Sequence, residues 1–146
     1  AKYDVYKLVN HGYKETMGRI GKFPFPMSVE EALSYIKNKL EIPVLRYAGN
    51  RDRLVEKIAI LGGAGAEFAE VAKSIGADLY LTGDLKYHEA QDAAMNGLVI
   101  ADGGHFYTER VIIPYLAKRL RDEFKTRGWN VGVLEDVRAK DIFHCV

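Results

Sequence analysis

Hydrophobic positions in the second half of the chain form short apolar runs that alternate with helix-like stripes. The apolar runs predict β-strands at residues 57–63, 77–84, 98–104 and 129–136. Apolar residues at helical spacing predict helices at 66–76, 85–97 and 108–128. Pro114 lies beyond the first turn of the last helix and should bend or break it early. This alternation predicts an α/β fold, with a layered mixed or parallel sheet and helices on both faces.

The first part of the chain is less regular. Residues 3–10 are rich in β-formers and predict a strand. Residues 11–27 hold several glycines and prolines, and they predict a long connecting loop and a candidate domain boundary. The next segment predicts a helix to residue 40, because Ser28 precedes Glu31 by three residues, as in a capping box. Residues 42–49 then predict a short strand.

Composition excludes several classes of protein. The 146 residues are 48% apolar and 28% charged, as in a soluble globular domain, and no apolar run is long enough to cross a membrane. The net charge is +1 with both signs mixed along the chain, so a nucleic-acid partner is not expected. Cys145 is the single cysteine, which rules out a disulfide framework within the chain and suits the cytoplasm.

Sites in α/β sheets lie beyond the carboxyl ends of the strands, and three loops occupy that position. The first, "GGAGAEF" at 62–68, has glycines that would let a phosphate approach a helix start. However, it lacks the third glycine of the dinucleotide fingerprint and the Gly-Lys-Ser/Thr of a P-loop. A tight strand-to-helix turn explains it equally simply.

The second loop, "TGDLKYHE" at 82–89, offers Asp84 and His88 as candidate catalytic residues. Their i, i+4 spacing would place both on one helix face if the helix has begun by Asp84. Alternatively, Asp84 is a helix N-cap, for which Asp is favoured, and His88 is a partly buried histidine bonded to a neighbour.

The third loop, "GGHFYTE" at 103–109, offers His105 and Glu109 as candidate metal ligands. Imidazole and carboxylate both bind zinc, iron and manganese, and a helical turn would let the two side chains meet one ion. Alternatively, Thr108 caps a helix and Glu109 lies in its first turn, where the helix dipole favours negative charge. On spacing alone the helix start is the commoner explanation, and two ligands do not complete a zinc site.

Taken together, the three loops resemble one family. "ILGGAGAEF…GADLYLTGDLKYHEAQDA…GLVIADGGHFYTE" is similar to the carboxy-terminal half of Nif-three-like proteins, also known as GTP cyclohydrolase I type 2 homologues or dinuclear metal centre hexameric proteins. The upstream "MGRIGKFPFPMSVEEALSYIKNKL" is similar to the Gly-Arg-Ile-Gly segment and following helix of that family. The resemblance runs from Met17 to about Glu135.

The resemblance implies that His105 and Glu109 bind a centre of two divalent ions of the zinc, iron or manganese class. It places Asp84 and His88 beside the same cleft, as groups that would contact the metal ligands or act in acid/base chemistry. The remaining family ligands, a tandem His-His and an Asp, lie in an amino-terminal half, and this sequence contains no His-His. We therefore expect further ligands outside this chain.

The same resemblance implies a domain organisation and two possible functions. Residues 1–10 would be the tail strand of an insert domain, 11–27 a connecting loop, and 28–146 the carboxy-terminal metal-centre domain. The intact protein would be a hexamer, and either a metal-dependent hydrolase or cyclohydrolase with a nucleotide-like small-molecule substrate, or a non-enzymatic metal-binding or regulatory scaffold. On its own, this chain would then be an incomplete, inactive domain.

Overall fold

The protein is built around one twisted, mixed sheet. The structure, a computed structural model, describes residues 3–4 and 17–144. Six strands pair in the order β1-β2-β4-β5-β6-β3. Their bounds are Tyr3–Asp4 (β1), Arg19–Ser28 (β2), Arg46–Ala48 (β3), Leu54–Ala64 (β4), Leu79–Gly83 (β5) and Val99–Asp102 (β6). β4, β5 and β6 are parallel, whereas β1, β2 and β3 pair antiparallel with their neighbours. The predicted mixed α/β fold is confirmed.

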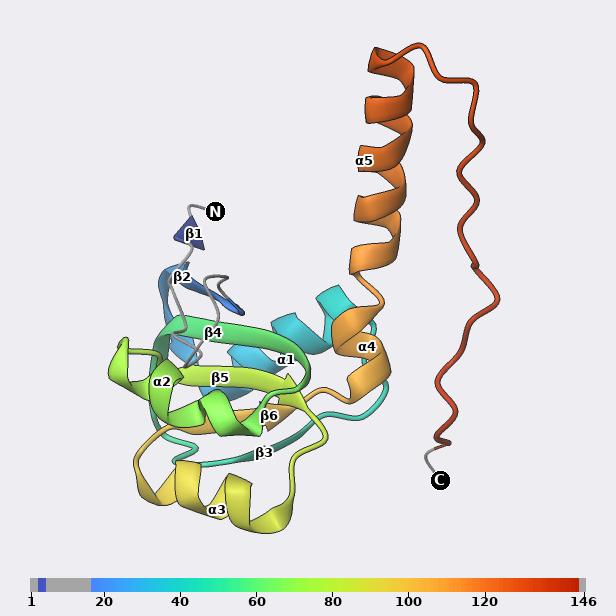
Figure 1. Cartoon of the computed structure of the whole chain (residues 1–146). Helices are drawn as coiled ribbons and strands as arrows, with labels where there is room; N and C mark the ends of the chain where they lie inside the picture. The colour runs from blue at the N-terminus through green and yellow to red at the C-terminus, as the bar shows by residue number, and fades with distance from the viewer. Residues whose placement is uncertain (1–2, 5–16, 145–146) are drawn as a thin grey trace.

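Helices cover both faces of the sheet (Figure 1). One face packs against α1 (Val29–Leu40), and the other packs against η1 (Ala66–Phe68), α2 (Ala69–Ser74) and α3 (Tyr87–Met95). Successive strand residues point to opposite faces, so Leu79 and Leu81 pack in the α1 core while Tyr80 packs in the α2 and α3 core. All five residues of β5 are buried, which explains the nearly continuous apolar run in the sequence.

The start of α1 is as predicted. Ser28 caps the helix: its side chain accepts a hydrogen bond from the Glu31 amide, while the Glu31 carboxylate accepts one from the Ser28 amide. The Ser28 hydroxyl also donates to the Glu31 carboxylate, and this hydrogen bond together with the one from the Ser28 amide lowers the pKa of Glu31 below its usual value. The following predicted strand, 42–49, is shorter in the structure, where β3 is limited to Arg46–Ala48.

The predicted connecting loop at 11–27 is wrong for its second half, where β2 forms. The proline pair Pro24 and Pro26 suggested a loop, but it lies where the β2–β4 register shifts between Lys22 and Met27. Proline cannot donate to a strand ladder and is tolerated at such bulges. Of the predicted strand 3–10, Tyr3 and Asp4 pair with β2 as β1, and the rest lies outside the described residues. The proposed division into an insert tail and a second domain stays a prediction.

The last predicted helix is split into two. α4 (His105–Glu109) and α5 (Ile112–Thr126) are separated at Arg110 and Val111. Pro114 is the third residue of α5, in the first turn, where a missing N–H breaks no intrahelical bond. The prediction that Pro114 would interrupt the helix early is confirmed, but the helical segment starts three residues earlier than expected.

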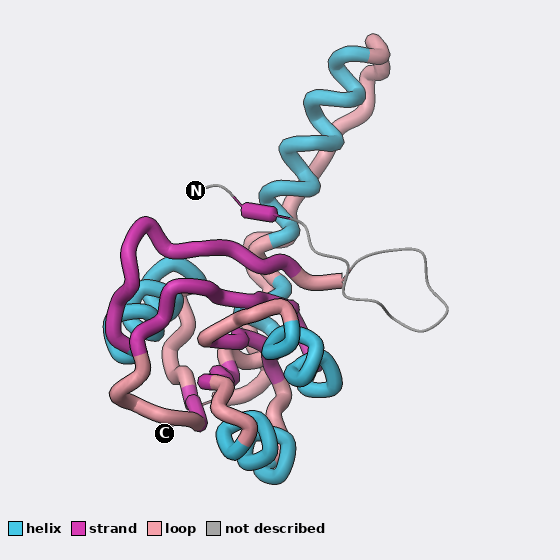
Figure 2. Tube along the Cα trace, turned by 90° about the vertical axis from the view of Figure 1, so that its left-hand side faces the viewer, coloured by secondary structure: helices cyan, strands magenta, loops and turns pink. Residues whose placement is uncertain are grey.

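The predicted strand at 129–136 is also wrong. α5 projects from the body, and the chain returns beside it as an extended coil, as Figures 1 and 2 both show. Arg121 of α5 holds this coil through the Glu135 carboxylate and the Val133 carbonyl. The segment is β-prone but has no sheet edge beside it, so it has no ladder to join.

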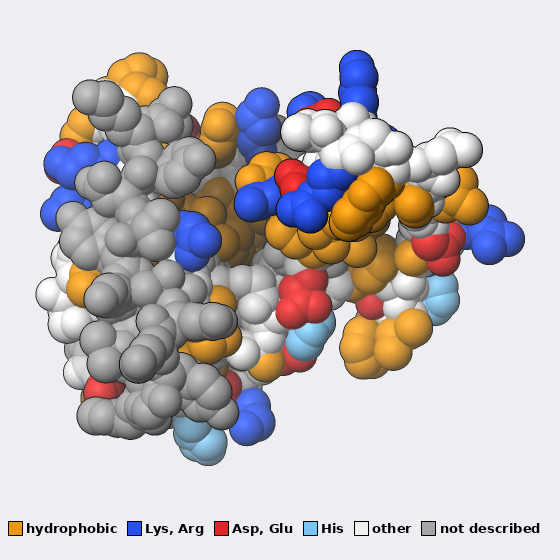
Figure 3. Space-filling model, turned by 45° about the horizontal axis from the view of Figure 1, so that its top comes forward, with side chains coloured by type: hydrophobic (Ala, Val, Ile, Leu, Met, Phe, Trp, Pro, Cys, Tyr) orange, Lys and Arg blue, Asp and Glu red, His pale blue; other side chains and the backbone are white. Residues whose placement is uncertain are grey.

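α5 and the coil that follows expose many large apolar side chains. Ala117 is the one buried residue of α5. The exposed apolar side chains of the helix are Ile112, Ile113, Tyr115, Leu116 and Leu120. Figure 3 shows hydrophobic side chains at the surface on the side of the molecule that carries α5. Nevertheless, none of the helices in the described part of the chain has the length and apolar character needed to cross a bilayer.

Candidate metal centre

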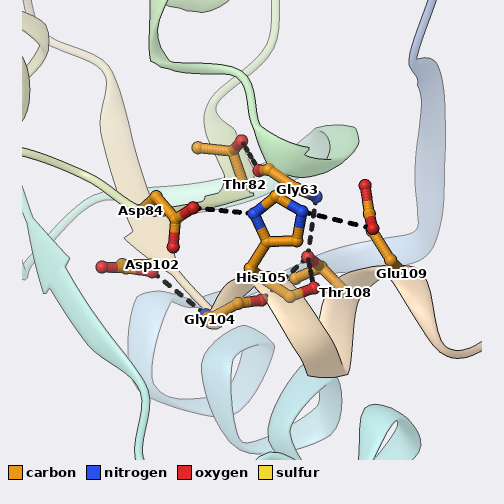
Figure 4. A network of polar contacts seen from close by, with 8 residues as sticks. All are labelled: Gly63, Thr82, Asp84, Asp102, Gly104, His105, Thr108 and Glu109. Atoms are coloured by element: carbon orange, nitrogen blue, oxygen red, sulfur yellow. Dashed lines mark hydrogen bonds and ion pairs between the residues drawn. The ribbon is translucent and has the colours of Figure 1, made fainter. Parts of the chain in front are cut away.

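The candidate site lies at one edge of the sheet, where residues at or after the carboxyl ends of three parallel strands meet. β4 ends in a glycine-rich segment at residues 62–65, where its register with β5 shifts, β5 is followed by Asp84, and β6 leads into His105. Parallel strands end at the same edge, which is why loops distant in sequence converge here. Three of the four candidate residues, Asp84, His105 and Glu109, are brought together (Figure 4).

His105 lies between two carboxylates. Its Nδ1 is 2.7 Å from Oδ2 of Asp84, and its Nε2 is 3.2 Å from Oε2 of Glu109. α4 begins at His105, so the i, i+4 turn that the metal interpretation requires is helical. Thr108 does not cap this helix: it lies inside α4, and Gly104 occupies the N-cap position.

Asp84 and His88 do not share a helix face. α3 begins at Tyr87 with Lys86 at its N-cap, so Asp84 lies before the helix and does not cap it. Asp84 has a positive φ of 56°, a backbone conformation that Asp tolerates better than most residues. His88 is exposed and packs edge-on against the ring of Tyr87. The structure therefore brings Asp84 to His105 and leaves His88 apart, and a role for His88 stays a prediction.

Two buried threonines fix the floor of the site to its neighbours. Thr82 of β5 donates to the Gly63 carbonyl at 2.9 Å, and Thr108 of α4 accepts from the Gly63 amide at 3.0 Å. The Thr108 hydroxyl also donates to the Gly104 carbonyl at 2.8 Å. Both backbone polar groups of Gly63 are thus bound to side chains from two other elements, and β4, β5 and α4 are tied together directly beneath His105 (Figure 4).

Gly63 leaves room for the two candidate ligands. Its φ is +69°, in the left-handed region that favours glycine. A Cβ at this position would lie 2.5 Å from Oε1 of Glu109 and 3.2 Å from Cε1 of His105. The missing side chain of Gly63, close to the end of β4, therefore makes space for His105 and Glu109.

The geometry fits part of a metal site. Zinc-to-ligand bonds of about 2.0–2.2 Å at tetrahedral or octahedral angles place neighbouring ligand atoms about 3.0–3.5 Å apart. The 3.2 Å between His105 Nε2 and Glu109 Oε2 matches that spacing. The carboxylate of Asp84 on the other ring nitrogen resembles the outer partner that orients a metal-bound histidine. Among residues 3–4 and 17–144, however, no group of three or more donor side chains could hold an ion.

The site opens into a large cleft of about 1590 Å³. It lies under α5 and its returning coil, and it is lined by Asp84, His105 and Glu109 together with Arg46 and Asp102. His88 is not among the lining residues. Half of the His105 side chain is exposed, which leaves it accessible to a ligand from the cleft.

Sequence reasoning missed the supporting residues Gly63, Thr82, Arg46 and Asp102, and it considered Thr108 only as a helix cap. Thr82 is next to last in β5 and Asp102 ends β6, and a polar residue at the end of a strand that enters a candidate loop is a usable signal. The contacts of Arg46 with Asp102 and of both threonines with Gly63 join different elements, so spacing along the chain could not reveal them.

The charge state of His105 depends on its two carboxylates. The hydrogen bond to Asp84 raises the pKa of His105 above its usual value of 6.5, slight desolvation opposes this shift, and Glu109 adds to it. A raised pKa means that the paired imidazolium stabilises the fold fully below the unfolded value, and that this contribution is lost as pH rises through the folded pKa. A metal ion needs the neutral imidazole, so metal affinity should fall as pH drops through the same range.

We expect Asp84→Asn to lower the pKa of His105 toward 6.5. Asn tolerates the left-handed backbone at this position, so the substitution removes chiefly the charge. The measurement is an NMR titration of the His105 ring protons. Asp92→Asn, which removes an exposed carboxylate from α3, is the control and should leave that titration unchanged. An equal pKa in the wild type and Asp84→Asn would show that the 2.7 Å contact does not form in solution.

Comparison with known proteins places the chain in a family. Residues 3–140 match Duf34/NIF3 (NGG1p interacting factor 3). The chain belongs to the Duf34/NIF3 family. The resemblance seen in the three loops is therefore confirmed.

Similar Duf34/NIF3 proteins are considerably longer than this chain. It is 34% identical over 131 residues to a "GTP cyclohydrolase 1 type 2 homolog" of Bacillus subtilis (strain 168), covering 90% of this chain and 35% of the relative. The homologue from Clostridium perfringens is 35% identical over 130 residues, covering 89% and 48%. The chain thus spans between about a third and a half of the length of these relatives.

Solved structures show the same fold. A Staphylococcus aureus protein, SA1388, superposes with a TM-score of 0.85 at 30% identity, covering 90% of this chain and 37% of that protein. A Bacillus cereus protein related to NIF3 superposes with a TM-score of 0.84 at 35% identity, covering 89% and 35%.

Proposed function

We propose that this chain supplies His105 and Glu109 to a metal centre of a Duf34/NIF3 protein. One observation carries the proposal: the imidazole of His105 is aligned by Asp84 on one nitrogen and faces Glu109 across 3.2 Å on the other. The complete centre would hold two divalent ions of the zinc, iron or manganese class. Its further ligands would come from outside this chain, because the described residues hold no group of three or more donors that could bind an ion.

The chemistry that best suits such a centre is metal-assisted hydrolysis. A pair of bound divalent ions supplies an activated water at neutral pH and stabilises charge on a phosphoryl or carbonyl oxygen. The residues of this chain would hold and orient the ions, and Asp84 would keep the His105 ring in one tautomer. Relatives described as homologues of GTP cyclohydrolase 1 type 2 support a nucleotide-like substrate.

A non-enzymatic metal-binding or scaffold role is the alternative. It is favoured by the two-donor set of the described residues, which is smaller than the three protein ligands usual at a catalytic zinc. In either case, we propose that the intact protein assembles as a hexamer. We also propose that it works in the cytoplasm, because a sequence with one cysteine has no need of an oxidising compartment.

Metal titration of an intact protein that contains this chain tests the proposal, because the described residues alone supply too few donors. We expect Zn²⁺ or Mn²⁺ to bind the intact wild type measurably by calorimetry, and His105→Ala or Glu109→Gln to weaken binding by more than about 100-fold, beyond the loss typical of an outer partner. His88→Ala, which removes an exposed histidine outside the cleft, is the matched control and should bind normally. Unchanged metal binding in His105→Ala would overturn the assignment.

An assay of substrate turnover distinguishes the hydrolase from the non-enzymatic metal-binding or scaffold role. If an intact protein with two bound ions hydrolyses a nucleotide, a phosphoester or a cyclic amide, and His105→Ala abolishes that activity, the hydrolase is supported. If it binds both ions but turns over none of these substrates, the metal-binding or scaffold role replaces it.

A further inference from the structure

Arg46 presents a fixed guanidinium to the cleft of the metal site. Arg46 and Asp102 are direct cross-strand partners on β3 and β6, so their side chains lie on the same face of the sheet. Nη2 of Arg46 donates to Oδ2 of Asp102 at 2.5 Å. The other carboxylate oxygen accepts from the Gly104 amide at 3.0 Å, directly before His105. One buried carboxylate therefore links Arg46 to the turn that carries the proposed ligand.

A structural arginine in the same protein looks different. Arg53 is 35% exposed and donates to two protein acceptors, the Asp78 carboxylate and the Gly97 carbonyl. The Arg46 side chain is 71% exposed, and among the described residues the structure gives it one acceptor, Asp102. A guanidinium carries five N–H donors. Most donors of Arg46 are therefore left for a ligand, which is more than a purely structural pair with Asp102 requires.

We propose that Arg46 binds an oxyanion of the substrate, a phosphate or a carboxylate, while the reacting bond lies at His105 and Glu109. Arg46, His105 and Glu109 line the same cleft. Guanidinium matches both oxyanions with paired hydrogen bonds, and a guanidinium already held at one end loses less freedom on binding. The role of this subsite in substrate binding rests on the proposed function, but anion binding by Arg46 can be measured without metal.

The test is an NMR titration of the metal-free chain with methyl phosphate and, separately, with sodium acetate. We expect saturable shifts of the Arg46 side-chain N–H and of the Gly104 amide with at least one of the two. Arg46→Ala should weaken this binding at least about 10-fold, as expected for loss of charge-assisted hydrogen bonds. Stronger binding of methyl phosphate would assign the subsite to phosphate, and stronger binding of acetate would assign it to carboxylate.

Arg51→Ala is a closely matched control. Arg51 is 70% exposed and also donates to a carboxylate at 2.5 Å, that of Glu30, but it lies outside the cleft. It should bind either anion as the wild type does. Equal losses of anion affinity in both variants would show that general surface charge explains the binding, which would overturn the proposed subsite. Unchanged anion binding in Arg46→Ala would overturn it directly.

Asp102→Asn separates binding from support of the fold. If Arg46 binds the ligand, this variant should keep anion binding, because the guanidinium remains and the side-chain carbonyl of the introduced asparagine can still accept its hydrogen bond. If Arg46 only supports the fold through Asp102, Asp102→Asn should lose the anion-induced NMR shifts, as Arg46→Ala does. Because both titrations omit metal, a failure of this subsite and a failure of metal binding at His105 are seen in different experiments.

Discussion

Gly63→Ala is expected to abolish metal binding at His105 and Glu109 and to destabilise the fold by about 2 kcal/mol or more. Two independent effects combine at this position. The backbone has a φ of +69°, which costs an L-residue about 1–2 kcal/mol. The added methyl group would also lie 2.5 Å from the Glu109 carboxylate, so Glu109 would have to leave the position it shares with His105.

Gly128→Ala is the control for Gly63→Ala. Gly128 has nearly the same φ, +67°, but a Cβ there meets nothing within 4 Å. It should therefore show the backbone cost in thermal unfolding and no loss of metal affinity by calorimetry. If Gly63→Ala binds zinc as tightly as Gly128→Ala does, the proposed site does not use the space above Gly63.

The local parts of the site could be predicted from the sequence. His105 and Glu109 are four residues apart, so a single helical turn suffices to bring them together. What spacing could not decide was whether the helix starts at His105 or at Thr108, and the metal and cap interpretations depended on that choice. The resemblance to a family favours the metal interpretation, and the structure shows where the helix starts: Gly104 takes the N-cap position and leaves Thr108 inside the turn. Metal binding by His105 and Glu109 stays a prediction.

The long-range parts could not be predicted. Asp84 contacts His105 across 21 positions, and it does so because β5 and β6 are parallel neighbours. No periodicity in the sequence encodes which strands become neighbours. The same limit explains the error at 129–136, where the residues favour a strand but the fold places no strand edge beside them.

The prolines of β2 show a different limit of sequence analysis. Pro24 and Pro26 locally argue against a strand, yet the segment on either side pairs with β4. A bulge lets the strand accommodate both residues, and bulges depend on the partner strand rather than on local propensity. The pairing of β2 with β4 is therefore set by tertiary contacts, which outweigh the local preference of proline against β-strands.

The exposed apolar face of α5 is consistent with a chain that spans only part of its relatives. Amphipathic helices in globular proteins bury their apolar stripe. Here Ile112, Leu116 and Leu120 recur at intervals of four and remain exposed, and Ile112 lines the cleft that holds the candidate ligands.

Thr108→Val is expected to weaken metal binding about 10–100-fold and to destabilise the fold by about 1–3 kcal/mol. Valine keeps the shape of threonine, but it removes the hydroxyl that accepts from the Gly63 amide and donates to the Gly104 carbonyl. Thr108 is almost completely buried, at 6% exposure, so the Gly63 amide would lose its partner where water does not easily replace it. The link between β4 and α4 beneath His105 would be lost as well.

Thr108→Ser tests whether loss of the hydroxyl causes the weaker metal binding of Thr108→Val. Serine keeps both hydrogen bonds and loses a methyl group, so it should restore most of the metal affinity while remaining somewhat less stable than the wild type. Calorimetric zinc titration and thermal unfolding measure the two effects separately. If serine and valine weaken metal binding equally, the methyl group positions the site as much as the hydroxyl does, and the hydrogen bonds alone do not explain the loss. If Thr108→Val binds zinc normally, the position of His105 and Glu109 does not depend on the link to Gly63, and α4 is held by its other contacts.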